Sequence, residues 1–401
     1  MKGLLEKISE ELQIDKSQWI PTKFGDVAIQ QKGKIDRDNT DLTRYVQGGH
    51  MNSEDLHLRS WGELKDEYLG PAFIRRFDEG DILYGSRRTY LRKVVIAPFS
   101  GITSNTTFVI RANEKNIDKQ LLPFIMMSEG FTENSVRNSK GSVNPYINWK
   151  DIAKYEFFLP PKDQQAQLAE LLWAMNEVIE TEKEVLDKTE KSRSFFIKEL
   201  LTGSIRLGDF DDSWQKYSMD ELAKYRRGSF PQPYGSKEWY DDVNGSAFVQ
   251  VYDIDYDLKL KKDTKSKISD KAKPMSVFVP KGTLIISIQG SIGRVAITQY
   301  DAYVDRTILI FQEFLKEIDL KYFTYTLQRI FKIAEKTAPG ATIKTITKET
   351  LSSFEINLPC FEEQKLIGER LTLLDQALFQ IKAKIETSQS LQKSLINQIF
   401  L

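Results

Sequence analysis

The 401-residue sequence is poor in the residues that support disulfide scaffolds and histidine chemistry. It has one cysteine, Cys360, and two histidines, His50 and His57. A single cysteine excludes an intramolecular disulfide framework and is typical of a reducing compartment. The two histidines lie seven residues apart in a polar stretch, which favours loop positions over a metal site or an acid–base pair. We therefore expect no disulfide scaffold, no histidine-based active site and no cofactor.

The sequence also lacks net charge and long apolar runs. Lys and Arg total 57, as do Asp and Glu, so the formal net charge is zero. This balance excludes a histone-like polycation, but it allows basic residues to be segregated locally. The longest apolar runs, such as residues 121–127, reach about a third of the roughly 20 residues that a membrane helix needs. The first 13 residues predict an amphipathic helix rather than a signal peptide, so we expect a soluble, globular, cytoplasmic protein.

No motif for catalysis stands out. The sequence has no Walker-type phosphate loop, and GSIGR at residues 290–294 is only a fragment of a glycine-rich loop. Asn144-Pro145-Tyr146 lacks the second proline of the Asn-Pro-Pro-Tyr motif of amino-methyltransferases. A stand-alone DNA methyltransferase or nuclease would need an adenosylmethionine loop or a set of metal-binding carboxylates, and the sequence indicates neither. It therefore favours a binding protein over an enzyme.

What the sequence does contain is one long internal repeat. Five segments recur in the same order, at offsets between 195 and 202 residues. They are residues 19–33 with 214–228, 79–86 with 281–288, 106–110 with 307–311, 141–148 with 340–347, and 152–161 with 351–360. The period is far longer than a solenoid unit, so each copy is interpreted as a whole domain followed by a connector.

Each copy ends in a long segment with a helical apolar period. We expect helices over about residues 162–202 and 361–400. About 38 helical residues at 1.5 Å each make a rod of roughly 57 Å. Apolar residues alternate at spacings of three and four, which predicts a coiled-coil seam between two antiparallel helices rather than one core helix per domain. The expected seam residues are Leu172, Met175, Ile179, Leu186 and Phe196, with Leu371, Leu374, Leu378, Ile381, Ile385 and Leu395.

The segments between the helices contain short runs of β-branched and aromatic residues separated by Gly, Asn and Asp, which is typical of α/β or β-rich domains. The predicted fold class is α+β: two globular α/β domains separated by two long antiparallel coiled-coil helices, with an internal pseudo-twofold repeat. The expected parts are an N-terminal helix over residues 1–18, a first domain over 19–160, a central helix over 161–204, a second domain over 205–358 and a C-terminal helix over 359–401.

Basic and polar loops recur at matching positions in both copies. Arg, Gln and Asn side chains can make paired hydrogen bonds to base edges, while Lys, Ser and Thr suit phosphates. Because the positions match while the residues differ, the pattern predicts one scaffold that reads two different DNA half-sites; for any single residue, a solvated loop is an equal alternative. The candidate DNA contacts are Arg87, Arg88, Tyr90, Arg92, Lys93, Asn105, Thr106, Lys140, Ser142 and Asn144, with Arg226, Arg227, Gln289, Ser291, Arg294, Arg306, Thr342 and Lys344.

Together these motifs resemble the specificity subunits of type I restriction-modification systems. The matching features are the openings at Trp19 and Trp214, the GDIL and GTLI strands, the FFLPP and INLPC entries to the long helices, and FIKELLTG at residues 196–203. Their order and duplication carry the resemblance, which covers nearly the whole chain. The second copy departs from the family's usual LPPLxEQ by having Cys360 and Phe361.

The resemblance implies a division of labour. Each domain would read one half of a bipartite sequence in double-stranded DNA, and the helices would set the spacing and dock two methyltransferase (modification) subunits. Endonuclease and translocase (restriction) subunits would join on the outside and, with the modification subunits, carry out all the catalysis. Exposed charges such as Glu177, Glu184, Lys188, Lys191, Lys382 and Lys384 are candidate docking positions or plain solvated helix faces. The alternative function is a coiled-coil adaptor with two protein-binding domains.

A near-neutral chain is expected to bind DNA weakly by itself, because phosphate contacts supply much of the affinity for DNA. Tight sequence-specific binding is expected only with the modification subunit present. Fluorescence anisotropy at physiological salt, with and without that subunit, measures the difference. Strong sequence-specific binding by the isolated chain would contradict the prediction.

Overall fold

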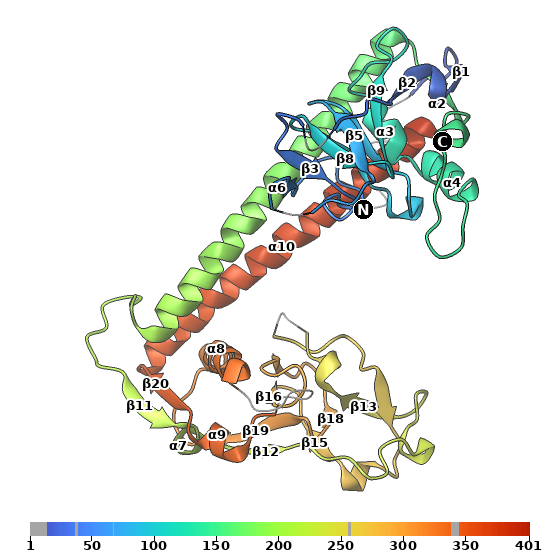
Figure 1. Ribbon diagram of the computed structural model, residues 1–401. Coiled ribbons are helices and arrows are strands. Elements are labelled where there is room, and N and C mark those ends of the chain that lie inside the picture. Colours follow the sequence, from blue (N-terminus) through green and yellow to red (C-terminus); the bar gives the residue numbers. More distant parts are fainter. Residues whose placement is uncertain (1–13, 37–38, 67, 256–257, 338–344) are drawn as a thin grey trace. The chain divides into compact units, whose positions relative to one another are not determined.

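The computed structural model describes residues 14–36, 39–66, 68–255, 258–337 and 345–401 (Figure 1). Contacts divide it into two compact units, which are described separately. Unit 1 holds the chain up to Glu184 together with Ala383–Leu401, and unit 2 holds Val185–Lys382. Of the helix predicted over residues 1–18, residues 1–13 lie outside the described part and residues 14–18 are not helical.

Unit 1 contains two four-stranded sheets and a two-stranded ribbon (Figure 1). The first sheet is antiparallel in the order β2-β9-β6-β7, and the second has the order β4-β3-β8-β5, in which β3 and β8 are parallel. The ribbon pairs β1 with β10. The strands are β1 (Ile20–Lys23), β2 (Ala28–Gln31), β3 (Arg44–Val46), β4 (Gly62–Glu63), β5 (Phe73–Phe77), β6 (Ile82–Gly85), β7 (Val94–Ile96), β8 (Gly101–Ser104), β9 (Thr107–Ala112) and β10 (Glu156–Leu159).

Unit 2 repeats this arrangement strand for strand. Its sheets have the orders β12-β19-β16-β17 and β14-β13-β18-β15, with β13 and β18 parallel, and its ribbon pairs β11 with β20. The sequence repeat is therefore a repeat of topology. The strands are β11 (Gln215–Ser218), β12 (Ala223–Arg227), β13 (Ser246–Val249), β14 (Ser266–Ile268), β15 (Val277–Val279), β16 (Leu284–Ser287), β17 (Val295–Ile297), β18 (Ala302–Val304), β19 (Ile308–Phe314) and β20 (Glu355–Leu358).

Short helices accompany the sheets, and one of them differs between the copies. Unit 1 has α3 and α4 where unit 2 has the single helix α8. The break lies at Ser128, whose extended backbone ends α3 and whose hydroxyl accepts a hydrogen bond from Phe131 N at 3.3 Å to begin α4. The helices are α2 (Phe24–Val27), α3 (Leu122–Met127), α4 (Glu129–Arg137), α5 (Trp149–Ile152), α7 (Met219–Leu222), α8 (Leu320–Thr337) and α9 (Lys348–Ser352), with 3-10 turns η1 (Thr89–Leu91), η2 (Lys237–Trp239), η3 (Val251–Asp253) and η4 (Lys273–Met275).

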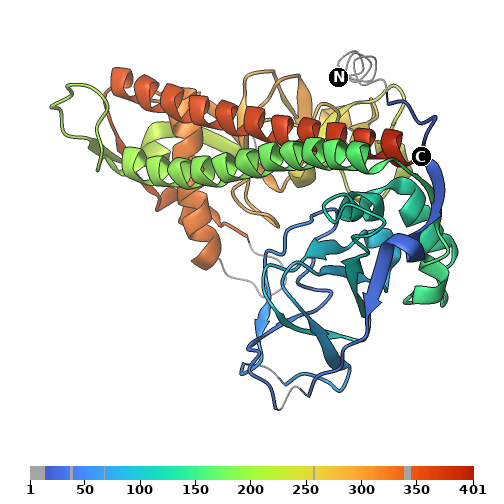
Figure 2. The ribbon, with the colours of Figure 1, turned by 90° about the horizontal axis from the view of Figure 1, so that it is seen from above.

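The two long helices, α6 (Lys162–Thr202) and α10 (Phe361–Phe400), cover the residues that the sequence predicts. In unit 1, Gln392 Nε2 donates to Leu172 O at 3.1 Å and Lys384 pairs with Glu182 at 3.2 Å. In unit 2, Lys382 pairs with Glu190 at 2.8 Å, and Arg193 pairs with Asp375. Residue numbers rise along α6 as they fall along α10, so the helices run antiparallel within each unit, and Figure 2 shows them side by side.

The predicted seam residues differ in how deeply their side chains are buried. Six are buried: Leu172, Ile179, Leu371, Leu378, Ile385 and Leu395. The other five are half-buried: Met175, Leu186, Phe196, Leu374 and Ile381. The residues nearest the helix ends belong to the globular cores. Leu172 of α6 and Leu395 of α10 lie in the main core of unit 1, and Leu200 of α6 and Leu371 of α10 lie in that of unit 2. Each core thus contains helix segments from both copies of the repeat.

A buried glutamine fastens the start of each long helix to its domain. Gln165 Nε2 donates to Pro160 O at 2.8 Å, and its Oε1 accepts from Asp118 N at 2.7 Å. Gln364 makes the same two contacts in unit 2, with Pro359 O at 3.0 Å and Asp319 N at 2.9 Å. Both side chains are almost fully buried, so these hydrogen bonds satisfy backbone groups that water does not reach.

The residue before each of these glutamines accepts a hydrogen bond from the tryptophan that recurs in the two copies. Trp19 Nε1 donates to Gln164 Oε1 at 2.9 Å, and Trp214 Nε1 donates to Glu363 Oε2 at 3.0 Å. Glu363 is fully buried and also receives Arg206 Nη2 at 2.7 Å. The paired Trp openings of the two copies therefore anchor the ribbon strands β1 and β11 to the long helices.

Replacing Gln165 with alanine is expected to lower the free energy of unfolding by about 1–3 kcal/mol, because a buried N–H and a buried carbonyl lose their partner. Urea denaturation of the full chain measures the loss. The control is Gln167→Ala, which truncates an exposed side chain on the same helix turn. Equal stability of the two variants would contradict the prediction.

Candidate nucleic-acid interface

In unit 1, three loops far apart in sequence are joined by backbone hydrogen bonds. Ser86 N donates to Thr106 O at 3.1 Å, and Ile147 N donates to Ser86 O at 2.9 Å. Arg88 N donates to Pro145 O at 2.7 Å. These contacts bring residues 86–93, 104–107 and 139–147 into one group, called loop cluster 1.

Unit 2 joins the corresponding loops in the same way. Ile288 N donates to Thr307 O at 2.9 Å, and Ile346 N donates to Ile288 O at 2.8 Å. Gln289 forms an isolated β-bridge with Thr345. Residues 287–294, 305–307 and 345–347 form loop cluster 2. The matched loops of the first copy therefore meet, and so do the described parts of their counterparts in unit 2; residues 340–344 of the third loop lie outside the described part of the chain.

Loop cluster 1 exposes most of the candidate DNA contacts from its three loops. The side chain of Tyr90 is 54% exposed at the tip of η1, which is bracketed by Arg88 at φ 50° and Arg92 at φ 49°. A left-handed backbone costs about 1–2 kcal/mol for such residues, so the surrounding contacts must hold this turn in place. The exposed candidates are Arg87, Arg88, Tyr90, Asn105, Lys140, Ser142 and Asn144.

Four candidates of the first copy are engaged with protein atoms. Lys140 Nζ lies 3.9 Å from Asp151 Oδ2, although the lysine side chain remains exposed. Thr106 Oγ1 lies 2.6 Å from Ser104 Oγ, and Lys93 Nζ donates to Gly48 O. The Arg92 side chain is only 10% exposed and pairs with Glu54 at 2.9 Å and with Glu129. These contacts direct the Arg92 guanidinium at carboxylates, whereas the neighbouring arginines are exposed.

Loop cluster 2 exposes a different set of side chains. Ser291 and Arg306 are exposed in loop cluster 2. Arg226 and Arg227 are exposed on strand β12, and Arg227 Nη2 donates to Ile346 O of the cluster at 3.3 Å. Gln289 and Arg294 are half-buried, and Arg294 Nη1 donates to Ile254 O at 3.3 Å. The candidates Thr342 and Lys344 lie outside the described residues.

The structure exposes two aromatic residues that are not among the candidate DNA contacts; for Tyr252 the sequence allowed stacking on bases but favoured a core position. Tyr146 is 42% exposed in loop cluster 1, directly after the matched residues Asn144 and Pro145. In unit 2, Tyr252 is 36% exposed and Lys265 Nζ lies 5.1 Å from its ring centroid. Exposed rings beside cations are suited to stacking on bases. The available signal was the position of Tyr146 within a matched loop; no sequence signal separated Tyr252 from core tyrosines.

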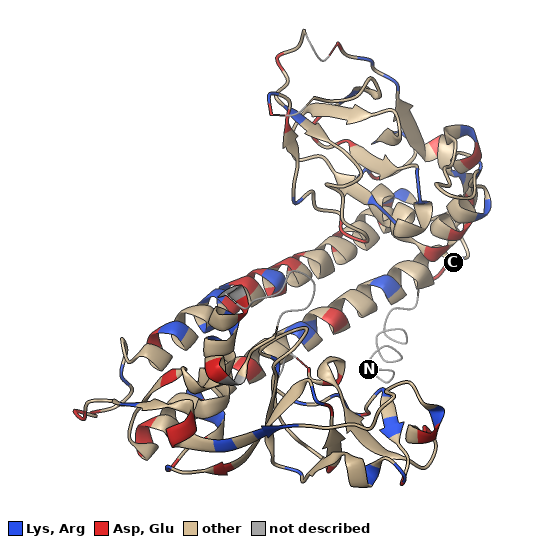
Figure 3. Cartoon of the chain, turned by 60° about the horizontal axis from the view of Figure 1, so that its bottom comes forward, with Lys and Arg blue, Asp and Glu red and all other residues tan. Residues whose placement is uncertain are grey.

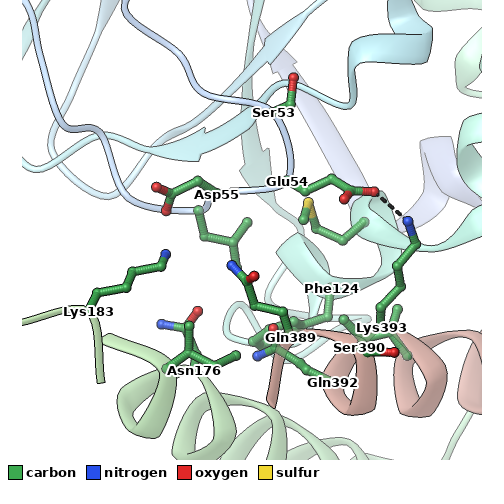
Figure 4. Close-up of a pocket in the computed structure, with 14 residues that line it drawn as sticks. Ser53, Glu54, Asp55, Phe124, Asn176, Lys183, Gln389, Ser390, Gln392 and Lys393 are labelled. Atoms are coloured by element: carbon green, nitrogen blue, oxygen red, sulfur yellow. Dashed lines mark hydrogen bonds and ion pairs between the residues drawn. The ribbon is translucent and has the colours of Figure 1, made fainter. Parts of the chain in front are cut away.

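The Glu54 partner of Arg92 lines, together with Lys393, a pocket of about 460 Å³ in unit 1 (Figure 4). Glu54 Oε1 accepts from Arg92 Nη1 at 2.9 Å and from Lys393 Nζ at 2.7 Å. Glu54 therefore bridges the η1 turn to helix α10, and its own backbone is left-handed at φ 54°. Burial by itself would raise the pKa of Glu54, but hydrogen bonds and attraction from Lys393 and Arg92 outweigh it and hold that pKa below its usual range.

Acidic and basic residues are interspersed along both long helices (Figure 3). Several candidate docking charges pair with neighbours, including Lys191 with Asp187 at 2.7 Å. The described residues contain no group of three or more His, Cys, Asp or Glu side chains placed to hold a metal ion. Among those residues, no helix has the length and apolar character needed to cross a bilayer.

The low pKa of Glu54 predicts a pH dependence of stability. Since the folded-state pKa lies below the unfolded one, the stabilisation is present above the unfolded pKa and is lost as the pH falls through the folded pKa. Glu54→Gln is expected to lower the free energy of unfolding at neutral pH by less than about 1 kcal/mol, because the site is partly exposed. When the pH is lowered, the free energy of unfolding should fall less in the variant than in the wild type.

Urea denaturation between about pH 6 and about pH 3 measures this difference. Glu79→Gln, which changes an exposed carboxylate of the same unit, serves as the control. A Glu54→Gln variant with the acid dependence of the wild type would contradict the prediction.

Comparison with known proteins identifies the family. The family described as "Type I restriction modification DNA specificity domain" matches residues 12–191 and again 211–388. The chain is 22% identical over 393 residues to the MjaVIII type I restriction enzyme specificity subunit of Methanocaldococcus jannaschii, with 89% of each chain covered. A second protein of that organism, provisionally named as the MjaX specificity subunit, is 24% identical over 365 residues and covers 86% of this chain and 84% of its own.

The fold has a solved counterpart. The type I restriction-modification S subunit from M. genitalium superposes with a TM-score of 0.60 at 14% identity, covering 98% of both chains. At this identity the likeness concerns the fold, and it agrees with the predicted pair of α/β domains joined by long helices. With two copies of the domain spanning most of its length, the chain belongs to the type I restriction modification DNA specificity domain family.

Proposed function

We propose that the chain is the non-catalytic DNA sequence-specificity subunit of a type I restriction-modification complex. Each domain reads one half of a bipartite target in double-stranded DNA through its loop cluster. The observation that carries the proposal is the duplication of these clusters. The same three loops meet in each unit through equivalent backbone hydrogen bonds, while the exposed side chains differ.

The chemistry of the clusters supports DNA as the ligand. Loop cluster 1 exposes two arginines, a lysine, two asparagines, a serine and two tyrosines. Loop cluster 2 exposes Ser291 and Arg306, and Arg226 and Arg227 are exposed on strand β12 of the same unit. Cationic and hydroxyl groups suit phosphates, and Arg and Asn can bind base edges through two hydrogen bonds. A fixed backbone reduces the entropy that ordering such loops on DNA would cost.

The long helices, residues 161–204 and 359–401, are proposed to set the spacing of the half-sites and to dock two modification subunits. Apolar side chains exposed on the helices support a docking role. Leu366 and Leu373 of α10 are 42% and 56% exposed and lie seven residues apart, on one face of the helix. Exposed leucines at such spacing are typical of a surface that a partner covers. Restriction subunits would join the complex formed with the modification subunits.

Exchanging the first domain is expected to change only one half of the DNA target. Residues 19–160 are replaced by the corresponding segment of a family member with another target, while the core-facing residues of α6 and α10 are kept. The chimera is assembled with modification subunits, and methylated positions are mapped by sequencing. A methylated target with one new half-site and an unchanged second half-site would support DNA recognition by the exchanged domain.

The control for this exchange is a segment from a relative that shares the first half-site. An unchanged target in a chimera that folds and assembles would contradict the proposal. That result would favour the alternative, a coiled-coil adaptor whose two domains bind proteins.

Substituting Leu373 with glutamate is expected to weaken binding of the modification subunit by about tenfold or more, because a buried contact would become a buried charge. Isothermal titration calorimetry measures the affinity, and thermal unfolding should stay near that of the wild type. Leu315→Glu, at a position that is 43% exposed outside the helices, is the control. Unaltered affinity of Leu373→Glu would exclude this face from the docking surface.

A further inference from the structure

The turn between β8 and β9 recurs between β18 and β19 with the same internal hydrogen bonds. In unit 1, Thr106 N donates to Ser104 Oγ at 3.3 Å, and the two side-chain hydroxyls lie 2.6 Å apart. In unit 2, Thr307 N donates to Asp305 Oδ1 at 3.0 Å, and the Thr307 hydroxyl donates to the same oxygen. In both turns, a short polar side chain caps the threonine two residues later.

The residue between these partners is Asn105 in unit 1 and Arg306 in unit 2, and the backbone around it is fixed. Asn105 N donates to Ala72 O at 2.8 Å, while the carbonyl of the following threonine accepts from Ser86 N at 3.1 Å. In unit 2, Asp305 N donates to Val249 O at 3.0 Å, and Ile288 N donates to the carbonyl of the following threonine at 2.9 Å. These hydrogen bonds tie each turn to its own loop cluster.

The side chains at the two turn tips are exposed while their capping neighbours are buried. Ser104 is 7% exposed and Asp305 is 3% exposed, whereas Asn105 and Arg306 are exposed. Within the described part of the chain, the Asn105 carboxamide and the Arg306 guanidinium make no hydrogen bond or ion pair. Their polar groups are therefore available to a ligand.

Arg306 is also oriented by an aromatic ring. Its Cζ lies 5.9 Å from the ring centroid of Tyr234, whose hydroxyl donates to Asp305 Oδ2 at 3.0 Å. Burial and the charge of Asp305 raise the pKa of Tyr234, so the phenol keeps its proton at working pH. A neutral ring held by the neighbouring carboxylate offers a fixed face for the guanidinium.

We propose that Asn105 and Arg306 occupy equivalent specificity-determining positions, with Asn105 reading an adenine in the first half-site and Arg306 a guanine in the second. The inference rests on the proposed function and deepens it. Asparagine pairs with N6 and N7 of adenine in the major groove, and arginine pairs with O6 and N7 of guanine. Each pairing uses two hydrogen bonds from one side chain, so the base is defined by the residue at the tip.

The change of residue between the copies favours base contact over phosphate contact. Phosphates are the same at every step of DNA, so a phosphate-binding turn has no need to change its side chain. Here the cap on the following threonine, the backbone hydrogen bond to that threonine's carbonyl and the exposure of the tip are retained, while an uncharged amide is replaced by a cation. That is the pattern expected of a position that reads a different base in each half-site.

The test uses the full chain assembled with modification subunits, and methylated positions are mapped on a library of DNA sequences. Asn105→Arg is expected to lower the preference for adenine at one position of the first half-site by about 5- to 150-fold and to introduce a preference for guanine. Arg306→Asn is expected to do the reverse in the second half-site. Each variant leaves the other half-site unchanged, which gives an internal control.

Two further variants separate base reading from general effects. Asn244→Arg places a new cation at an exposed position of unit 2 outside loop cluster 2 and should leave base preferences unchanged. Lys140→Ala removes a candidate phosphate contact and should weaken binding evenly across sequences. The slope of the logarithm of the binding constant against the logarithm of the salt concentration should become smaller by about one. If Asn105→Arg or Arg306→Asn does not fold or assemble, Asn105→Ala and Arg306→Ala test the same loss of preference without a new charge.

The outcomes distinguish the inference from the function on which it rests. A wild-type complex without sequence-defined methylation would refute the proposed function itself. A wild-type complex with a bipartite target, whose base preferences survive the Asn105 and Arg306 variants or weaken evenly at all positions, would overturn only the inference. A preference that changes in the opposite half-site from the one assigned would overturn it as well.

Discussion

The structure depends on the way the long helices complete the cores of the two globular units. Leu172 of α6 and Leu395 of α10 are buried in the main core of unit 1, and Leu200 of α6 and Leu371 of α10 are buried in that of unit 2. A helix with an apolar stripe must bury it, and here the stripe is covered partly by the other helix and partly by sheets. Neither domain is a closed unit without helix segments from the opposite copy of the repeat.

Two buried glutamines attach the starts of the long helices to the domains by hydrogen bonds. Gln165 and Gln364 occupy the same place at the start of their helices, and each satisfies a buried carbonyl and a buried N–H. Such groups are costly to leave unpaired, so the helix start can sit in only one way against its domain. The loop clusters lie on these domains, and their own backbone hydrogen bonds hold the loops together.

Each loop cluster combines a fixed backbone with side chains that differ between the two copies, and this combination suits the recognition of two different DNA half-sites. Backbone hydrogen bonds hold the three loops of each cluster, so a residue at a turn tip can change without altering the scaffold. The cluster around Arg92 adds a second kind of role. Its pairing with Glu54 and Glu129 suits a residue that positions the η1 turn, while Tyr90 at the tip is exposed.

The sequence by itself determined the repeat, the two long helices and the family, because periodicity and motif order are local properties of the chain. It also selected the loops that meet in each cluster, since matched positions in two copies share one topology. Only the tertiary structure decided which side chains of those loops are exposed. Arg87 and Arg92 look alike in sequence, yet Arg92 faces carboxylates, one of them contributed by a residue 38 positions earlier. Burial and pairing arise from long-range contacts, and no local pattern encodes them.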